Sequence, residues 1–142
     1  MSTVKDIMTW HVVVIGVNHS ILEAAQLMTS HHIGCLAIMD GEKLAGIITE
    51  RDFVRRVVAE KLPFDTKASG VMSNPVITIN SDASIREAAT LMATNKVRRL
   101  PVLEQNKIIG IIVSSDIVRH LGKKTVTEQV LAALGRSTFN PQ

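Results

Sequence analysis

The sequence predicts an α/β fold made of two β-α-β-β-α units. Three observations lead to this prediction. The 142-residue chain is 46% hydrophobic but only 3% aromatic, its second half repeats the first without a gap, and each copy alternates β-branched runs with helical periodicity. An aliphatic core of this kind suits sheets covered by helices. Two long repeats indicate a duplicated domain rather than a solenoid.

The repeat has an offset of 64 positions and brings like residues together along most of the chain. Matching pairs include Met8 with Met72, Ser20 with Ser84, Glu23 with Glu87, Leu36 with Leu100, Gly46 with Gly110 and Asp52 with Asp116. We therefore expect a first domain at residues 1–64, a second at 65–122 and a tail at 123–142.

Each copy is expected to form the same elements in the same order. Short β-branched runs at 12–15 and 76–79 predict strands. Ser20 and Ser84 are each followed three residues later by Glu, which predicts capping boxes and helices to about His32 and Lys96. Strand pairs follow at 35–39 with 44–48 and at 99–103 with 108–113. Each pair leads into a last helix, at about 50–60 and at 114–121.

Local signals place the linker and the tail. Pro63 ends the preceding helix, so the linker is expected at 62–69. In the tail, Thr125 and Glu128 predict a cap for a short helix that stops at Gly135. Its apolar positions are Val126, Val130, Leu131 and Leu134. Because such a helix is marginal alone in water, we expect it to pack on the body or on a second subunit.

Composition narrows the function classes. The net charge is +3, which ordinary solubility explains, and the lack of aromatic stacking platforms argues against binding of single-stranded nucleic acid. Cys35 lies in an apolar run and is expected to be a buried thiol. No apolar run approaches the length of a membrane span and no leader pattern is present, so a cytoplasmic protein without membrane contact is expected.

Catalytic and metal motifs do not stand out in the sequence. His31 and His32 are adjacent, so they do not share a helix face, and His11 and His19 are expected in loops. No Walker loop, nucleophile elbow or Cys-x-x-Cys motif is present. We therefore expect no enzyme activity, no metal and no cofactor.

The tandem unit resembles the CBS-domain pair, or Bateman module, over about residues 4–121. The motifs that carry the resemblance are Asp6-Ile-Met8-Thr9, Gly70-Val-Met72-Ser73, Val97-Arg98-Arg99-Leu100-Pro101-Val102 and Gly46-Ile-Ile-Thr49-Glu-Arg-Asp52. The resemblance implies a regulatory module that binds an adenine nucleotide (AMP, ADP or ATP) or a related adenosyl ligand such as S-adenosylmethionine. It also implies a homodimer and a regulated protein partner that the sequence does not identify.

Asp52 and Asp116 have two interpretations. As an acid in a first helical turn, each could simply cap its helix. In the resemblance each carboxylate also accepts hydrogen bonds from the ribose hydroxyls, which suits an acceptor with two oxygens. The second copy has Val113 where the first has Thr49, so Ser114 or Ser115 is considered as an alternative cap.

Arg98 and Arg99 are either a solvated charge pair or a phosphate site, for which guanidinium groups are suited. The resemblance implies two ligand clefts, one that contains Asp116 and one that contains Asp52. At the positions equivalent to Arg98 and Arg99 the first copy has Gly34 and Cys35, so the clefts differ in charge. Phosphorylated ligands should therefore prefer the Asp116 cleft. For that cleft the resemblance implies Val13, Ile33, Gly34, Arg98, Arg99 and Ile111 beside Asp116. For the other it implies Thr49, Ile77 and Val97 beside Asp52, with Arg98 considered there as the one candidate cation. Thr9 and Ile47 complete the implied ligand set.

Two other functions stay open at this point. One is a protein-interaction module whose clefts bind no ligand. The other is nucleic-acid binding, with which the mildly positive net charge is compatible.

Overall fold

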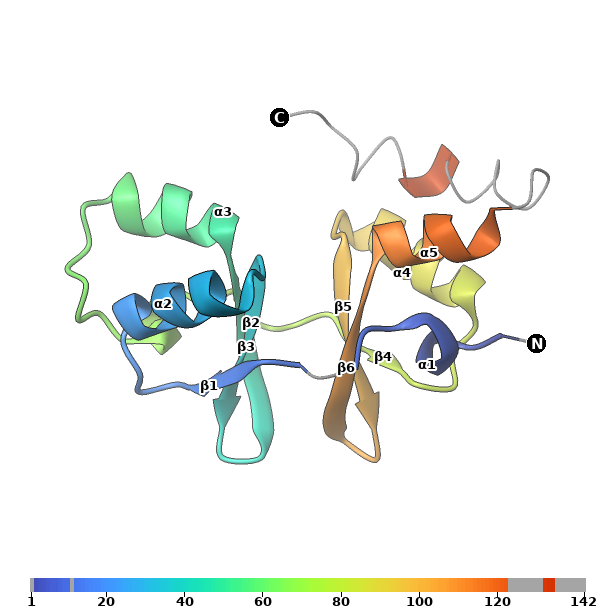
Figure 1. Cartoon of the computed structure of the whole chain (residues 1–142), viewed down its shortest axis with the longest axis horizontal. Coiled ribbons are helices and arrows are strands. Elements are labelled where there is room, and N and C mark those ends of the chain that lie inside the picture. Colours follow the sequence, from blue (N-terminus) through green and yellow to red (C-terminus); the bar gives the residue numbers. More distant parts are fainter. Residues whose placement is uncertain (1, 11, 123–131, 135–142) are drawn as a thin grey trace. The chain divides into compact units, whose positions relative to one another are not determined.

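The computed structural model describes residues 2–10, 12–122 and 132–134 and has the predicted α/β architecture (Figure 1). The chain divides into two compact units. The first-repeat unit is Val12–Val76, and the second-repeat unit combines Met1–His11 with Ile77–Gln142. The segment at 2–10, which includes the repeat residue Met8, belongs to the second-repeat unit, and the linker belongs to the first-repeat unit. The domain boundary at 64 and 65 stays a prediction.

The first-repeat unit has one three-stranded sheet in the order β1-β2-β3. Its strands are β1 (Val14–Gly16), β2 (Cys35–Asp40) and β3 (Lys43–Thr49). β1 runs parallel to β2, and β3 runs antiparallel to it. Its helices are α2 (Ile21–His31), the single turn α3 (Glu50–Asp52), the π-helix η1 (Phe53–Val58) and the 3-10 turn η2 (Ala68–Gly70).

The second-repeat unit repeats this topology in the order β4-β5-β6. Its strands are β4 (Ile79–Asn80), β5 (Arg99–Glu104) and β6 (Lys107–Val113). Its helices are α1 (Val4–Ile7), α4 (Ile85–Asn95) and α5 (Ser114–Leu121). The registers match across the repeat, since Gly46 lies opposite Ile38 and Gly110 lies opposite Val102.

Most of the predicted elements are confirmed, and the capping boxes account for the helix starts. The Ser20 hydroxyl accepts from the Glu23 amide at 3.1 Å, and the Ser84 hydroxyl accepts from the Glu87 amide at 3.0 Å. Two predictions were inaccurate. β1 and β4 are shorter and begin later than expected, because only their last residues pair in parallel with β2 and β5. The helix expected at 50–60 is one α-turn followed by a π-helix.

A short segment covers the outer edge of the last strand in each unit. Thr9 exchanges two backbone hydrogen bonds with Ile111 of β6, at 2.8 and 2.9 Å. Ser73 does the same with Ile47 of β3, at 2.8 and 3.2 Å. These bridges satisfy edge groups that would otherwise be unpaired. The segment at 2–10 thus extends the second-repeat sheet, and residues 71–73, which follow the linker, extend the first-repeat sheet.

An ion pair also fastens the segment at 2–10 to the second-repeat unit. The Lys5 ammonium lies 3.0 Å from a Glu104 carboxylate oxygen, and the Ser81 hydroxyl donates to the same oxygen at 2.9 Å. These two hydrogen bonds lower the pKa of Glu104 from its ordinary value, with Lys5 as the larger cause.

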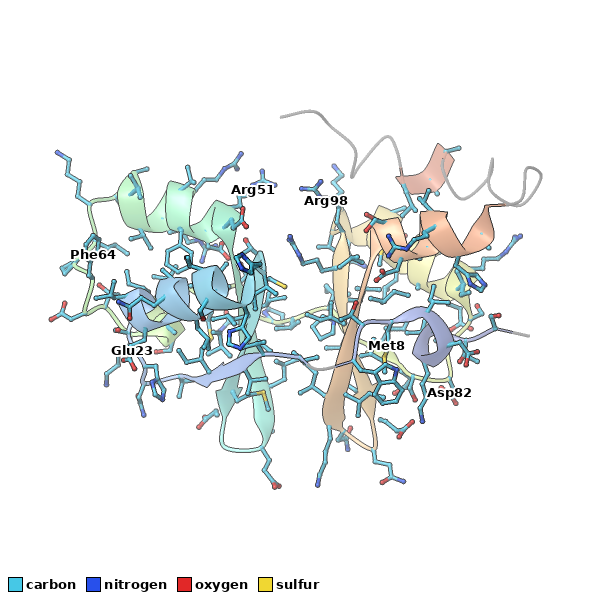
Figure 2. The ribbon with its side chains drawn as sticks, viewed as in Figure 1. Met8, Glu23, Arg51, Phe64, Asp82 and Arg98 are labelled. Atoms are coloured by element: carbon cyan, nitrogen blue, oxygen red, sulfur yellow. The ribbon has the colours of Figure 1, made fainter. Side chains whose placement is uncertain are left out.

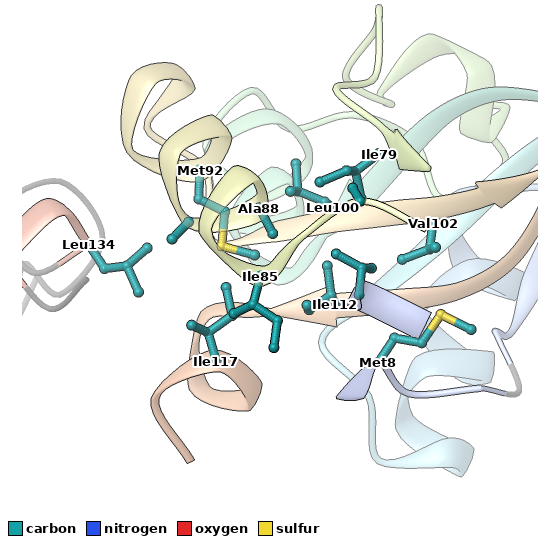
Figure 3. Packing of buried hydrophobic residues seen from close by; sticks show 13 residues of the cluster. Met8, Ile79, Ile85, Ala88, Met92, Leu100, Val102, Ile112, Ile117 and Leu134 are labelled. Carbon is teal, nitrogen blue, oxygen red and sulfur yellow. The ribbon is translucent and has the colours of Figure 1, made fainter. Parts of the chain in front are cut away.

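Each unit has its own aliphatic core. The second-repeat core packs α4 and α5 against the sheet and includes Met8, Met92, Leu100, Ile112 and Ile117 (Figure 3). Leu134, from the helical residues 132–134, is fully buried in the same cluster. The rest of the predicted tail helix, including Thr125, Val126, Glu128, Val130, Leu131 and Gly135, lies outside the described residues. Within the part of the chain that the structure describes, no helix is long and apolar enough to cross a membrane.

Candidate functional site at the strand-to-helix junctions

Asp116 is a buried carboxylate where β6 passes into α5. Its side chain accepts from the Val113 amide at 2.9 Å through Oδ2 and from Arg119 Nη2 at 2.6 Å through Oδ1. The suggestion that Ser114 or Ser115 caps this helix was wrong, since the Asp116 carboxylate accepts the amide at the N-cap. Only 7% of Asp116 is exposed, so this carboxylate depends on its partners for solvation.

Asp52 occupies the equivalent junction between β3 and α3. Its Oδ2 accepts from the Thr49 amide at 2.9 Å and from the Thr49 hydroxyl at 3.2 Å. Its Oδ1 lies 3.8 Å from Arg56 Nε. The capping interpretation is therefore confirmed for Asp52. This role leaves other acceptor positions of the carboxylate open to a ligand, because an ionised carboxylate has about four of them.

Arg98 and Arg99 lie beside the Asp116 junction within the same unit. The Arg98 carbonyl accepts from the Ser114 amide at 2.9 Å, and Arg99 lies opposite Val113 in the β5–β6 ladder. The Arg98 side chain is exposed (Figure 2) and that of Arg99 is partly buried. Among the described residues, neither guanidinium group forms an ion pair or a side-chain hydrogen bond. Both are therefore available to an anionic ligand.

The first-repeat junction has the same backbone frame without these cations. The Gly34 carbonyl accepts from the Glu50 amide at 3.1 Å, and Cys35 lies opposite Thr49. Cys35 is only partly buried, so the expectation of a buried thiol was inaccurate, because it begins a strand instead of lying in its middle. The prediction that the two junctions differ in charge is supported by this comparison.

The two units divide the predicted ligand set between them. The first-repeat unit contains Val13, Ile33, Gly34, Ile47, Thr49 and Asp52, and the second-repeat unit contains Thr9, Ile77, Val97, Arg98, Arg99, Ile111 and Asp116. Within the second set, Thr9 and Ile111 are joined by two backbone hydrogen bonds. The assignment of Val13, Ile33 and Gly34 to the same ligand as Asp116, and of Ile77 and Val97 to that of Asp52, stays a prediction.

Two arginines at these junctions were not predicted from the sequence. Arg119 is the ion-pair partner of Asp116, and 71% of its side chain is exposed. Arg56 lies near Asp52 and also donates to the Val71 carbonyl at 2.8 Å, so it connects η1 to the segment at 71–73 that follows the linker. An Arg three or four residues after an Asp on a helix is the signal that could have indicated both contacts.

The family assignment follows from matches in both repeats. Residues 4–59 and residues 68–123 each match the profile of the CBS domain. The chain belongs to the CBS-domain family. As a CBS-domain pair it belongs to a class of regulatory modules.

Two sequence relatives cover most of this CBS-domain chain. It is 38% identical over 117 residues to the CBS domain-containing protein YhcV of Bacillus subtilis, covering 82% of this chain and 84% of YhcV. It is 34% identical over 134 residues to hypoxic response protein 1 of Mycobacterium tuberculosis, covering 93% and 94% of the two chains.

Two similar crystal structures contain bound groups. The CBS-domain pair of protein MJ0100, in complex with 5′-methylthioadenosine and S-adenosyl-L-methionine, has a TM-score of 0.77 at 31% identity and covers 86% of this chain and 97% of its own. Hypoxic response protein I, with two coordinated zinc ions, has a TM-score of 0.76 at 35% identity and covers 84% and 99%. In the described residues of this chain, no group of three or more His, Cys, Asp or Glu side chains is placed to hold a metal.

Proposed function

We propose that this CBS-domain pair is a regulatory sensor of an adenine nucleotide or a related adenosyl ligand, and that Asp116 and Asp52 accept hydrogen bonds from ribose hydroxyls. The observation that carries the proposal is a buried, ionisable carboxylate at the same strand-to-helix junction of both units. A vicinal diol offers two donors, and a carboxylate is an acceptor with two oxygens. The adenosyl ligands bound to the similar MJ0100 pair support this chemistry.

The charges next to Asp116 suggest which ligand each junction takes. Arg98 and Arg99 lie beside Asp116 without ion-pair partners among the described residues, whereas the equivalent positions beside Asp52 are Gly34 and Cys35. Guanidinium groups bind phosphate in a fixed fork geometry. We therefore assign ADP or ATP to Asp116 and a less anionic adenosyl ligand, or none, to Asp52.

Replacing Asp116 with asparagine tests the proposed function. Asp116→Asn keeps the shape but removes the charge, and it should weaken ADP or ATP binding by about 1–3 kcal/mol if ribose hydroxyls are its partners. Asp52→Asn should change the binding of that ligand less. Titration calorimetry measures both affinities, and melting temperatures report stability.

The control is Asp65→Asn, which makes the same charge change at an exposed linker position. If capping is the only role of the two junction carboxylates, both variants lose about 1 kcal/mol of stability and neither changes affinity. Loss of ATP binding in Asp52→Asn but not in Asp116→Asn would show that the ligand assignment is reversed.

We further propose that the chain is a homodimer in solution. Large apolar side chains remain exposed in the described residues, among them Trp10 at 47%, Val14 at 43% and Phe64 at 66%. Their burial between copies would remove apolar surface from water. Sedimentation equilibrium at micromolar concentration should give twice the chain mass, and a species of 15.5 kDa would contradict the proposal.

A further inference from the structure

The two carboxylate oxygens of Asp116 have different partners. Oδ2 accepts from the Val113 amide at 2.9 Å and so caps α5, whereas Oδ1 accepts from Arg119 Nη2 at 2.6 Å. A hydrogen bond between a cation and an anion is roughly twice as strong as one between neutral groups. The Asp116 side chain is 7% exposed and the Arg119 side chain is 71% exposed. The oxygen that the cap does not use is therefore held by a side chain at the surface.

The proposed ribose contact needs the oxygen that Arg119 occupies. A vicinal diol presents two hydroxyl donors side by side, which suits the two oxygens of one carboxylate. Oδ2 can keep its cap and accept one hydroxyl, but Oδ1 is the acceptor for the other. Because the Asp116 side chain is so little exposed, it has little surface left for a ligand while Arg119 stays in place. Ribose hydroxyls and the guanidinium group therefore compete for Oδ1.

Moving Arg119 away from Asp116 costs little. Among the described residues, the Arg119 side chain makes no other ion pair or hydrogen bond. Its largely exposed guanidinium group exchanges the carboxylate for water, and exposed ion pairs contribute little net stability in proteins. By contrast, the Asp116 carboxylate is buried and needs a partner at all times. A ligand hydroxyl can thus replace Arg119, and Arg119 can return when the ligand leaves.

The Asp52 junction lacks such a contact. Arg56 Nε lies 3.8 Å from Asp52 Oδ1, which is too far for a hydrogen bond, and Arg56 Nη1 donates to the Val71 carbonyl at 2.8 Å. The partner is four positions away from Asp52 because η1 is a π-helix, whose turns contain more residues than those of an α-helix. Arg55, which matches Arg119 at the offset of 64, is exposed and has no ion pair among the described residues. An arginine hydrogen bond to Oδ1 is therefore a feature of the second-repeat carboxylate.

We propose that Arg119 is a latch on Asp116 that the ribose hydroxyls of the ligand displace. The proposal rests on the function proposed above, because it concerns the same carboxylate. The latch lowers the affinity for a ligand with both hydroxyls, so the Asp116 site fills only at a higher ligand concentration than an open carboxylate would allow. Each binding event also frees a cation on the exposed side of α5, which gives the sensor a change in surface charge that depends on the ligand.

The test compares ATP with 2′,3′-dideoxy-ATP by titration calorimetry on the full chain. Both nucleotides carry the same base and phosphates, so the ratio of their affinities reports the diol alone. Arg119→Met removes the guanidinium group at similar side-chain length, and it should raise the preference for ATP about threefold or more, the contribution expected of an exposed ion pair. The ligand-free variant should also melt at a lower temperature, because the buried carboxylate loses a partner.

Two further variants separate the latch from other effects of charge. Arg55→Met makes the same change at the equivalent exposed position of the first repeat and should leave the preference for ATP unchanged. Arg119→Lys keeps a cation that can donate to Oδ1. Its preference for ATP should therefore stay closer to that of the unmodified chain than the preference of Arg119→Met does.

The latch is wrong if Arg119→Met lowers the preference for ATP, because Arg119 would then position Asp116 for the ligand. It is also wrong if the preference is unchanged, or if Arg55→Met raises it equally. These results leave the ribose contact in place when the unmodified chain prefers ATP. Equal affinities for the two nucleotides in both the unmodified chain and Arg119→Met would contradict the ribose contact as well. The absence of ATP binding to either protein would contradict the proposed ligand and the latch together.

Discussion

Replacing Gly110 with alanine is expected to lower the free energy of unfolding by about 2–3 kcal/mol, as overpacking of a core typically does. A Cβ atom at Gly110 would lie 2.5 Å from the Met8 sulfur and 2.7 Å from the Thr9 carbonyl oxygen. Met8 lies against β6 in the core of the second-repeat unit (Figure 2). The Thr9 oxygen is held by its hydrogen bond from the Ile111 amide, so it can retreat only if that bridge weakens.

The equivalent change at Gly46 should cost less. The three atoms nearest to a Cβ atom there all belong to the Met72 side chain, with Sδ at 2.5 Å, Cγ at 2.7 Å and Cβ at 3.0 Å. Because a methionine side chain can adopt another rotamer, we expect about 1–2 kcal/mol. The expected difference follows from the Thr9 carbonyl oxygen, a backbone atom that is among the three atoms nearest to a Cβ atom at Gly110, whereas the three nearest at Gly46 are side-chain atoms.

Urea unfolding of both variants checks these values, with Gly70→Ala as the control. A Cβ atom at Gly70 would meet only Thr66 Cγ2 at 3.5 Å, an ordinary contact, so its effect should stay within about 0.5 kcal/mol. In double mutants, Met72→Ala should relieve Gly46→Ala more than Met8→Ala relieves Gly110→Ala. Equal stability of Gly110→Ala and Gly70→Ala would contradict the packing argument.

Replacing Arg98 and Arg99 together with alanine is expected to weaken ATP or AMP binding by tenfold or more for each hydrogen bond to phosphate that the change removes. A charge-assisted hydrogen bond contributes roughly 1.5–3 kcal/mol. Adenosine binding should change little, because adenosine has no phosphate. Since neither guanidinium group holds another described side chain, the fold should tolerate the change. Calorimetry with ATP, AMP and adenosine measures the three affinities.

The control for this double mutant is Arg86→Ala, which removes an exposed arginine from α4 of the same unit. It tests whether any loss of cationic charge in this unit weakens nucleotide binding. Equal losses for adenosine and ATP would show that Arg98 and Arg99 support the fold and not the phosphate. A loss of ATP affinity in Arg86→Ala of the same size would show a long-range charge effect only.

Much of the local structure could be predicted because its causes lie within a few residues. The capping serines and their glutamates are three positions apart, and short apolar runs place β2, β3, β5 and β6 nearly as observed. The junction carboxylates were found for the same reason, since Thr49 and Asp52 interact within one helical turn. Their partners Arg56 and Arg119 are also local, at the helical spacing of three or four residues.

The sequence by itself determined the duplication, the α/β class, the helix starts and the difference in charge between the two junctions. Tertiary structure alone decided which sheet edge the segments at 2–10 and 71–73 complete, how Gly46 and Gly110 contact Met72 and Met8, and where Leu134 packs. The physical reason is the range of the interactions. Caps and apolar runs are set by neighbouring residues. Edge pairing and core contacts join residues that are distant in the chain, such as Ser73 with Ile47 and Thr9 with Ile111, and form only when a packed surface selects its partner.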